Sequence, residues 1–246
     1  MSVPALTYSR MPVRLPHNRE FSRRCLYFDG IEDNVDFGFW ADLNTDRFTI
    51  EYFLKVIEAE SEDYDSPAYR DNNLWETFID VQALPPRWRH GYYFSIGGAP
   101  IFRTGGRLRY GEWYHFFVEY DGSDITQYVN CIYDISDPAA GAVHDAFNQP
   151  LLLMENTDLP LWLNGYMNHF RFYTRALTQA ERWHNMLNYN NPVADGLVLW
   201  AAMEEGQGLT AFDSSVGGHN GTLNPAPTPP LWARVQRHEL RAESEG

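Results

Sequence analysis

Apolar side chains recur at every second position through much of the central sequence. Between residues 48 and 56 the alternating apolar positions are Phe48, Ile50, Tyr52, Leu54 and Val56. Between residues 114 and 120 they are Tyr114, Phe116, Val118 and Tyr120. Successive side chains of a β-strand point to opposite faces of a sheet, so this alternation predicts half-buried antiparallel strands.

Glycine-containing pairs separate the predicted strands. The pairs are Asp29-Gly30, Gly97-Gly98, Gly105-Gly106, Asp121-Gly122, Asn164-Gly165 and Gly217-Gly218. Segment 196–203 is a nearly continuous apolar run, which is typical of a central strand. Short strands between regular turns predict an all-β fold, in which two antiparallel sheets pack as a β-sandwich.

One segment has a helical period instead. Thr178 and Glu181 have the spacing of a capping box, and Ala180, Trp183 and Leu187 then form an apolar stripe. We therefore predict one short capped helix that ends by Asn190.

Composition divides the chain of 246 residues into a body and two arms. Residues 1–24 contain three prolines and five arginines against one glutamate, so they predict an extended arm with a net charge of +4. Residues 25–224 hold 11 basic and 29 acidic residues and are predicted to form one sandwich domain. Residues 225–246 begin with a proline-rich run and are predicted to form a tail.

The charge and the absence of apolar runs limit the classes of partner. The net charge is −14, so the acidic body is not expected to bind nucleic acid. The N-terminal segment lacks the apolar stretch of a secretory signal, and no window approaches about 18 apolar residues. We expect neither Sec-type export nor membrane insertion. Cys25 and Cys131 have no metal-site spacing and are expected to be small buried side chains.

Five stretches, taken in order, resemble the laminin-G-like or concanavalin-A-like jelly-roll domains. They are 26–38 (an opening hairpin), 48–55 (a long strand), 112–131 (two strands about an Asp-Gly turn), 163–181 (a strand and capped helix) and 196–223 (a returning strand and loop). Cys131 stands where the family usually has Gly, and Asn168-His169 stands where it usually has Asp-Glu. The resemblance implies a jelly roll over about residues 25–224, a fold that hosts both sugar-binding modules and glucanases.

The segment FDSSVGGHNGTL, residues 212–223, contains Asp, Ser and His close together. It lacks the Gly-x-Ser-x-Gly elbow of a nucleophilic serine. Asp213 and Ser214 suit the start of a tight turn, and Gly217, Gly218 and Gly221 suit positive φ. We interpret the segment as a turn, with no catalytic residue.

Carboxylates at alternate positions provide a second test for an enzyme. Retaining glycosidases place two carboxyl groups about 5–5.5 Å apart. Only Glu58, Glu60 and Glu62 have a suitable spacing, and the acidic, turn-rich residues after them indicate a solvated loop beyond about Ile57. We therefore predict no enzyme, with a glycoside hydrolase as the remote alternative.

No cofactor is expected except Ca²⁺. Its candidate ligands are Asp63, Asp65 and Asp71, because loop carboxylates suit a hard cation.

Two non-enzymatic functions remain. The first is a structural protein of a larger assembly, such as a phage capsid decoration or tail-associated subunit, made in the cytoplasm and located in the virion. Its arms would contact copies of itself or other assembly proteins, since a basic arm complements an acidic neighbour. The second is a lectin-like module that binds surface glycans, with or without Ca²⁺. The alternative locations are the cytoplasm, or the exterior by a route without a Sec-type signal.

Candidate contact residues fall in two groups. Those for a partner or a glycan are Trp75, Arg87, Trp88, Arg89, Tyr92 and Tyr93. Trp, Tyr and Arg dominate interface hot spots, although the same aromatics suit a core equally well. Those in the N-terminal arm are Arg10, Arg14, Arg19, Arg23 and Arg24.

Overall fold

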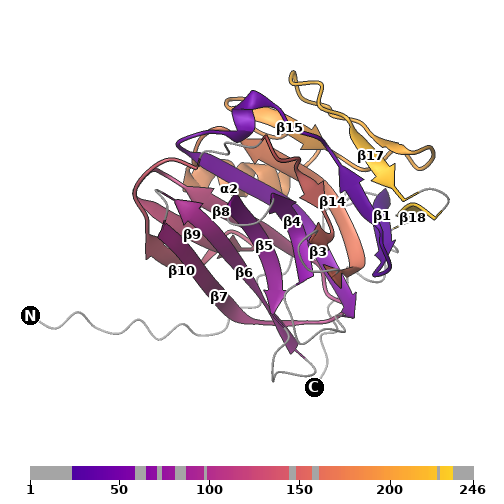
Figure 1. The fold of residues 1–246 in the computed structure, drawn as a ribbon, viewed down its shortest axis with the longest axis horizontal. Helices are drawn as coiled ribbons and strands as arrows, with labels where there is room; N and C mark the ends of the chain where they lie inside the picture. The colour runs from indigo at the N-terminus through magenta and orange to yellow at the C-terminus, as the bar shows by residue number, and fades with distance from the viewer. Residues whose placement is uncertain are drawn as a thin grey trace, which may run out of the picture.

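A computed structural model of the chain describes residues 24–58, 65–70, 74–80, 87–96, 99–143, 148–156, 161–225 and 228–234. Two antiparallel eight-stranded sheets form its two layers (Figure 1). This confirms the predicted β-sandwich. Within the described ranges, no helix has the length and apolar character needed to cross a bilayer.

The first layer, sheet A, contains the long central strands. Its order is β10 (Ile132–Pro138), β9 (Asp124–Val129), β8 (Tyr114–Tyr120), β3 (Phe48–Glu58), β14 (Asn164–Tyr173), β1 (Arg24–Asp29) and β18 (Leu231–Arg234). The eighth strand, β15 (Leu197–Ala201), pairs with β14 beyond the end of β1.

The second layer, sheet B, covers the inner face of sheet A. Its order is β16 (Thr210–Ala211), β17 (Gly221–Asn224), β2 (Asn34–Asp36), β11 (Leu152–Leu153), β4 (Asp65–Arg70), β5 (Trp75–Asp80), β6 (Arg87–Ile96) and β7 (Ala99–Arg109). A short pair, β12 (Glu155–Asn156) with β13 (Leu161–Trp162), and a 3₁₀ turn, η1 (Ala41–Leu43), complete the described elements of this part of the fold.

The core lies between the sheets and follows the alternation in the sequence. The five apolar side chains of β3 predicted to share a face all belong to it, as do Phe116, Val118 and Tyr120 of β8. The opposite face of β3 is also buried, because Thr49 and Glu51 are covered by the segment around α2 (Gln179–Leu187). The Thr49 hydroxyl donates to the Arg175 carbonyl at 2.8 Å, and Asn185 Nδ2 donates to Glu51 Oε2 at 2.7 Å.

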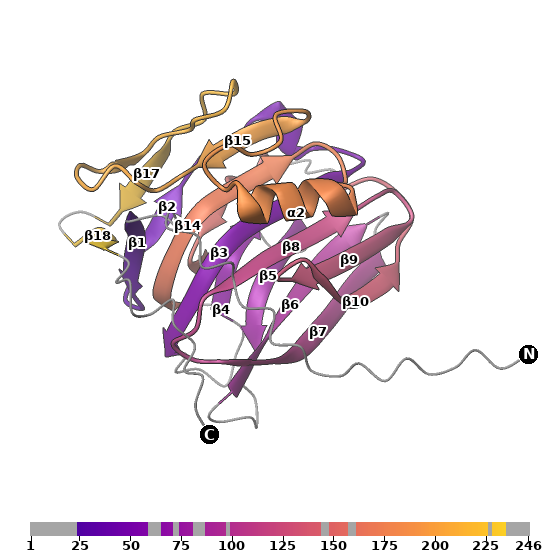
Figure 2. The same cartoon turned by 180° about the vertical axis from the view of Figure 1, so that it is seen from behind.

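Helix α2 forms where the capping box predicts it, but the predicted apolar stripe is wrong: Ala180 and Leu187 are exposed, and the buried apolar side chain of the helix is Met186. The Thr178 hydroxyl accepts a hydrogen bond from the Glu181 amide, and the Glu181 carboxylate accepts one from the Thr178 amide at 2.8 Å. Figure 2 shows α2 lying across the outer face of sheet A. A second apolar cluster holds it there, formed by Phe117, Cys131, Tyr173, Leu177, Met186 and Leu197.

The two cysteines are buried free thiols, as expected. Asn130 and Cys131 connect β9 to β10 with φ values of 52° and 62°, in the left-handed region that favours glycine. A glycine, which the resemblance implies at the second position, would adopt this conformation without strain. Here the Cys131 sulfur lies 3.7 Å from the Met186 sulfur, so the side chain also packs against α2.

Two predicted strand arrangements are wrong. Residues 26–38 form no hairpin, because β1 pairs with β14 and β18 in sheet A while β2 pairs with β11 and β17 in sheet B. The turn between them crosses the layers, with the Asp29 amide donating to the Asp33 carboxylate at 3.0 Å. The apolar run at 196–203 is not central either: β15 has β14 as its one full strand partner among the described residues, plus a single bridge from Ala201 to Asp213.

The sheets extend past both predicted domain boundaries. Arg24, assigned to the arm, begins β1, and Leu231–Arg234, assigned to the tail, form β18 against β1. The Arg24 guanidinium donates to the Glu204 and Glu205 carbonyls at 3.2 and 2.8 Å. The strand at the end of the body therefore includes four residues of the proposed tail, while residues 1–23 and 235–246 lie outside the described ranges.

The segment 212–223 is a turn, in agreement with its interpretation. Asp213 Oδ1 accepts hydrogen bonds from the Trp200 and Ser215 amides at 2.9 and 2.8 Å, and Oδ2 accepts from the His219 amide at 2.8 Å. Of its three glycines only Gly218 has positive φ, at 69°. A Cβ at position 217 would lie 2.2 Å from the Val198 carbonyl oxygen, so that glycine allows a close approach of backbones.

Candidate functional site

A polar pocket of about 240 Å³ opens beside the N-terminal end of α2. Strand β8, strand β9 and the segment leading into the helix enclose it. The lining residues are Glu119, Asp121, Asp124, Thr126, Tyr128, Ala176, Leu177, Gln179 and Arg182. Ligand pockets are typically about 300–1,000 Å³, so this one suits a single small group, such as one sugar ring.

The β8–β9 hairpin sets the carboxylates of the pocket. Glu119 pairs directly with Thr126, so both side chains point out of sheet A toward α2. Asp121 closes the turn, because its Oδ1 accepts from the Ser123 and Asp124 amides at 2.8 and 2.9 Å. The alternation of β9 then places Asp124, Thr126 and Tyr128 on the same outer face.

Arg182 of α2 forms the side of the pocket. Its Nη1 donates to Glu119 Oε2 at 2.6 Å and to the Leu177 carbonyl at 2.7 Å. Its guanidinium carbon lies 3.7 Å from the centroid of the Tyr128 ring, in a cation–π contact. One residue therefore joins the helix to both strands of the hairpin.

Glu119, which lines the pocket, has one carboxylate oxygen without a hydrogen-bond partner among the described residues. Its side chain is only 6% exposed, and Oε1 has no hydrogen-bond partner within the described part of the chain. The nearby Leu177 amide donates to the Thr49 hydroxyl at 3.2 Å and also acts on the Glu119 carboxylate, whose pKa it lowers. Burial raises the pKa of Glu119 to about 8, although the Arg182 charge acts in the opposite direction. A ligand group that paired with Oε1 would remove the cost of an unsatisfied buried polar atom.

Asp121 behaves in the opposite way at the exposed end of the hairpin. Burial acts to raise its pKa. The hydrogen bonds from the amides of Asp124 and Ser123 and from the Ser123 hydroxyl together outweigh this effect, so the pKa lies below its usual value. Asp121 is therefore ionised at neutral pH.

A second polar cluster lies beneath α2 but is closed to solvent. Glu51 Oε1 accepts from Arg171 Nη1 and lies 2.8 Å from His115 Nε2, while Asn185 binds its other oxygen. The side chains of Glu51, His115 and Arg171 are 0% exposed. Burial alone would raise the pKa of Glu51, but the charge of Arg171 and the His115 hydrogen bond hold it below its usual value. This cluster fixes α2 to sheet A and offers no room for a ligand.

The Asn168-His169 pair, where the family usually has two acids, adjoins this cluster. Both side chains are buried, and the bulge in β14 between Asn168 and Arg171 gives His169 a φ of 49°. Trp200 Nε1 donates to His169 Nδ1 at 3.3 Å. Burial, with help from Arg171 and His115, places the pKa of His169 well below its usual value, so the ring is neutral.

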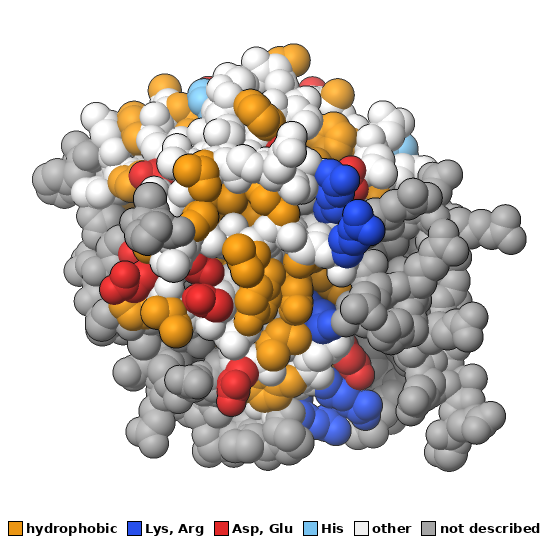
Figure 3. Space-filling view, turned by 90° about the vertical axis from the view of Figure 1, so that its right-hand side faces the viewer, with side chains coloured by type: hydrophobic (Ala, Val, Ile, Leu, Met, Phe, Trp, Pro, Cys, Tyr) orange, Lys and Arg blue, Asp and Glu red, His pale blue; other side chains and the backbone are white. Residues whose placement is uncertain are grey.

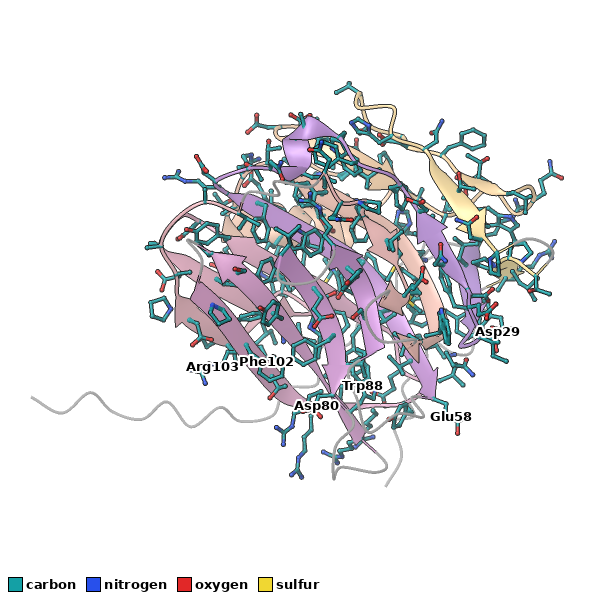
Figure 4. All side chains as sticks on the ribbon, in the orientation of Figure 1. Asp29, Glu58, Asp80, Trp88, Phe102 and Arg103 are labelled. Atoms are coloured by element: carbon teal, nitrogen blue, oxygen red, sulfur yellow. The ribbon has the colours of Figure 1, made fainter. Side chains whose placement is uncertain are left out.

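The structure divides the six residues proposed to contact a partner or a glycan. The prediction is wrong for Trp75, Trp88 and Tyr92, because these side chains are 2%, 0% and 0% exposed and belong to the core between the sheets. Figure 4 shows Trp88 on β6 near one end of the sandwich. The remaining three, Arg87, Arg89 and Tyr93, alternate with them on the outer face of β6 and are partly exposed. Only these three could reach a ligand.

The proposed calcium ligands fall outside what the structure describes. Asp63 and Asp71 lie outside the described residues, and Asp65 begins β4 but its side chain is not described. Elsewhere in the described ranges, no three His, Cys, Asp or Glu side chains come together in a way that could hold a metal ion. Calcium binding stays a prediction.

The carboxylates considered for glycoside hydrolysis do not form a described site. Glu58 is the exposed last residue of β3, and Figure 4 shows it projecting from the end of the strand. This agrees with the predicted strand end near Ile57. Glu60 and Glu62 lie outside the described residues.

Four of the five arm arginines, namely Arg10, Arg14, Arg19 and Arg23, lie outside the described residues. Arg24 is exposed and its side chain donates to the carbonyls of Glu204 and Glu205 in the same chain, and its contact with a partner stays a prediction.

The sequence does not predict the pocket as a whole, although it predicts the hairpin turn and the start of the helix that line it. The Asp121-Gly122 turn and the capping box at Thr178 each predict local structure correctly. The two motifs come together because β14 leads into α2, which lies over β8 and β9. Neither motif contains information about this topology.

The sequence matches the family model of the concanavalin A-like lectin/glucanases superfamily over residues 29–181, more than half of the chain. The chain belongs to this superfamily. The match spans both strands that line the pocket and ends within the first turn of α2. No curated protein matches the sequence.

Solved structures of this superfamily fold resemble the chain at low sequence identity. One is a candidate carbohydrate-binding protein from Bacteroides ovatus, with 18% identity and a TM-score of 0.66 over 88% of this chain. The chain spans 62% of the length of that protein. Another is the heptameric SAP-like pentraxin of Limulus polyphemus, with 12% identity and a TM-score of 0.52 over 71% of this chain and 84% of that one. At these identities the likeness establishes the fold alone.

Proposed function

We propose that the chain is a non-enzymatic carbohydrate-binding module and that the pocket beside α2 holds one sugar ring. The observation that carries the proposal is Glu119, a buried residue of the pocket lining whose Oε1 has no hydrogen-bond partner among the described residues. Membership in a superfamily of lectins and glucanases supports this class of function.

The lining side chains suit hydroxyl groups. Asp121 and Asp124 supply acceptors, Thr126 can donate and accept, and the exposed Gln179 amide can do both. The Tyr128 ring adds an apolar edge next to these polar groups, a combination common in small-molecule sites. The buried Arg182–Glu119 pair holds the wall in place.

The first prediction concerns filling the pocket. Ala176→Tyr is expected to weaken glycan binding at least about tenfold, which corresponds to 1.4 kcal/mol, because the added ring occupies the space of the ligand. Ala180→Tyr is the matched control, since Ala180 lies four residues further on in the first turn of α2, is exposed and does not line the pocket. Binding would first be found on a glycan array and then measured by titration of the strongest ligand.

The control is expected to bind within about twofold of the parent chain. Binding of no glycan by the parent would overturn the proposed function. Equal binding by the parent and Ala176→Tyr would show that the sugar lies elsewhere, which would overturn the assignment of the pocket.

A second candidate function is the assembly role predicted from the arms. The observation that favours it is an apolar face at the open edge of the sandwich, where Figure 3 shows apolar side chains beside basic ones. Exposed apolar residues in the nearby strands and loops include Leu209, Phe212 and Leu231, at 52%, 54% and 62% exposure. Strand β18 pairs with β1 alone among the described strands, and such an edge can accept another chain. The partner, and a place in a virion, remain proposals.

The assembly role predicts self-association through this edge. Leu231→Lys is expected to convert a concentration-dependent oligomer into a monomer, because a charged side chain on an edge strand opposes pairing. Leu187→Lys is the control, since Leu187 is exposed on α2 away from this edge. Light scattering measures the mass. A parent chain that is monomeric at all concentrations would contradict self-association, and an oligomer unchanged by Leu231→Lys would contradict the use of this edge.

A further inference from the structure

The charge of the pocket narrows the class of sugar that it would hold. Three of its lining residues, Glu119, Asp121 and Asp124, are acids, and Arg182 is its one basic lining residue in the described chain. Arg47 lies near the turn, against Gly122, and does not line the pocket. The lining therefore has an excess of acidic groups, in a chain whose net charge is −14.

Arg182 is engaged through Nη1 and through its guanidinium face, while its buried Nε has no hydrogen-bond partner among the described residues. Its Nη1 already donates to Glu119 Oε2 and to the Leu177 carbonyl, and its guanidinium face rests on Tyr128. These two hydrogen bonds, at 2.6 and 2.7 Å, fix the Arg182 side chain in the wall of the pocket. A ligand carboxylate or phosphate would also meet Asp121 and Asp124.

The start of α2 does not change this conclusion. A helix N-terminus favours anions because its first amides lack partners. Here the Thr178 hydroxyl accepts a hydrogen bond from the Glu181 amide, and the Glu181 carboxylate places a negative charge at this end of the helix. The helix terminus is thus already complemented within the chain.

The buried oxygen of Glu119 requires a partner of a particular kind. The charged groups that act on Glu119 are Arg182 from α2 and Glu51 from β3, and Glu51 is a second negative charge that disfavours ionisation of Glu119. A cation placed at Oε1 would oppose this repulsion, whereas a neutral hydroxyl would not.

We propose that the pocket binds an amino sugar through its protonated amine, which donates to Glu119 Oε1 near the carboxylates of Asp121 and Asp124. This inference rests on the proposed glycan-binding function and names the class of sugar. An ammonium group has three donors and a positive charge, so it meets both the unpaired oxygen and the acidic surroundings. Binding would stabilise the ionised form of Glu119 and release its proton.

Titration calorimetry near neutral pH and at low salt tests the proposal. D-glucosamine is expected to bind at least about tenfold more tightly than N-acetyl-D-glucosamine or D-glucose, because these lack the charged amine. Added salt is expected to weaken the binding of glucosamine more than that of the two neutral sugars. Calorimetry in buffers of different ionisation enthalpy is expected to show proton release with glucosamine alone.

Glu119→Gln is expected to remove the preference, so that glucosamine binds within about threefold of glucose. Glu112→Gln is the matched control, because Glu112 precedes the same hairpin, is exposed and does not line the pocket. Circular dichroism checks the fold of both variants. Asp124→Asn provides a second test at an exposed lining position and is expected to lower the affinity for glucosamine about threefold.

The outcomes separate the two proposals. Equal binding of glucosamine, N-acetylglucosamine and glucose, blocked by Ala176→Tyr, would overturn the amine preference and leave the glycan-binding pocket intact. Tighter binding of a neutral sugar would overturn it in the same way. No binding of any sugar would overturn both, and a glucosamine preference that persists in folded Glu119→Gln would overturn the role of Glu119.

Discussion

Replacing Glu51 with alanine is expected to lower the free energy of unfolding by about 3–5 kcal/mol, because the change leaves the buried charge of Arg171 without its counter-ion. Glu51 and Arg171 are both 0% exposed, and Glu51 also binds His115 and Asn185. The pKa of Glu51 lies below its usual value: burial opposes this, and the Arg171 charge outweighs it. The carboxylate is therefore the charged partner that Arg171 needs.

Urea denaturation measures the loss in Glu51→Ala, and Glu58→Ala is the matched control. Glu58 is the exposed last residue of the same strand, so its replacement is expected to change the free energy of unfolding by less than about 0.5 kcal/mol. A loss below about 1 kcal/mol in Glu51→Ala would contradict the role given to the ion pair.

This cluster also shows which part of the fold the sequence could not predict. The alternation in β3 predicts the inner face correctly, because apolar residues at every second position leave few alternatives. It says nothing about the other face, where Glu51 and Thr49 are polar and yet buried. Their burial depends on partners as far away as Arg171, 120 positions along the chain. Such pairs become visible only when the topology is known.

The alternation along β6 predicts which of its aromatic side chains are buried. Trp88 and Tyr92 have the same parity as Phe94 and Ile96, and all four belong to the core. The period of two therefore already indicated that only the intervening positions, Arg87, Arg89 and Tyr93, could face outward. Residue type suggested a binding surface, while position along the strand decided the orientation.

The pocket could be predicted only in parts. The Asp121 turn and the Thr178 capping box are local motifs with local causes, and both form as expected. The carboxyl of Glu119, which decides the proposed chemistry, has no local motif at all. Its burial comes from α2 lying over β8, and this contact joins positions 63 apart in the chain.

The buried titratable groups are expected to give the chain a maximum of stability near pH 6–6.5. Two groups of residues with opposite pH dependence set this maximum. His90, His115 and His169 have lowered pKa values because they are buried, and that of His90 is about 3. Their stabilising contribution is complete above the unfolded pKa of about 6.5, and it is lost as the pH falls through the folded values. Glu51, also lowered, adds a further loss below its unfolded value of 4.5.

Glu119 controls the alkaline side. Burial raises its pKa from 4.5 to about 8, so its contribution is largest below pH 4.5 and is lost as the pH rises to about 8. Asp33, raised by burial to about 6, acts in the same way between pH 3.8 and 6. Above pH 6.5 the histidines no longer compensate, and the unfolding free energy is expected to fall by about 2 kcal/mol between pH 6.5 and 8.

Urea denaturation at a series of pH values checks this profile, with Glu119→Gln as the variant that isolates the alkaline side. Glutamine does not ionise, so the fall between pH 6.5 and 8 is expected to shrink strongly in this variant and to persist in the exposed control Glu112→Gln. A fall that is the same in all three proteins would mean that Glu119 is already ionised at pH 6.5. Its Oε1 would then be a carboxylate oxygen in the unliganded pocket, and glucosamine would bind there without releasing a proton.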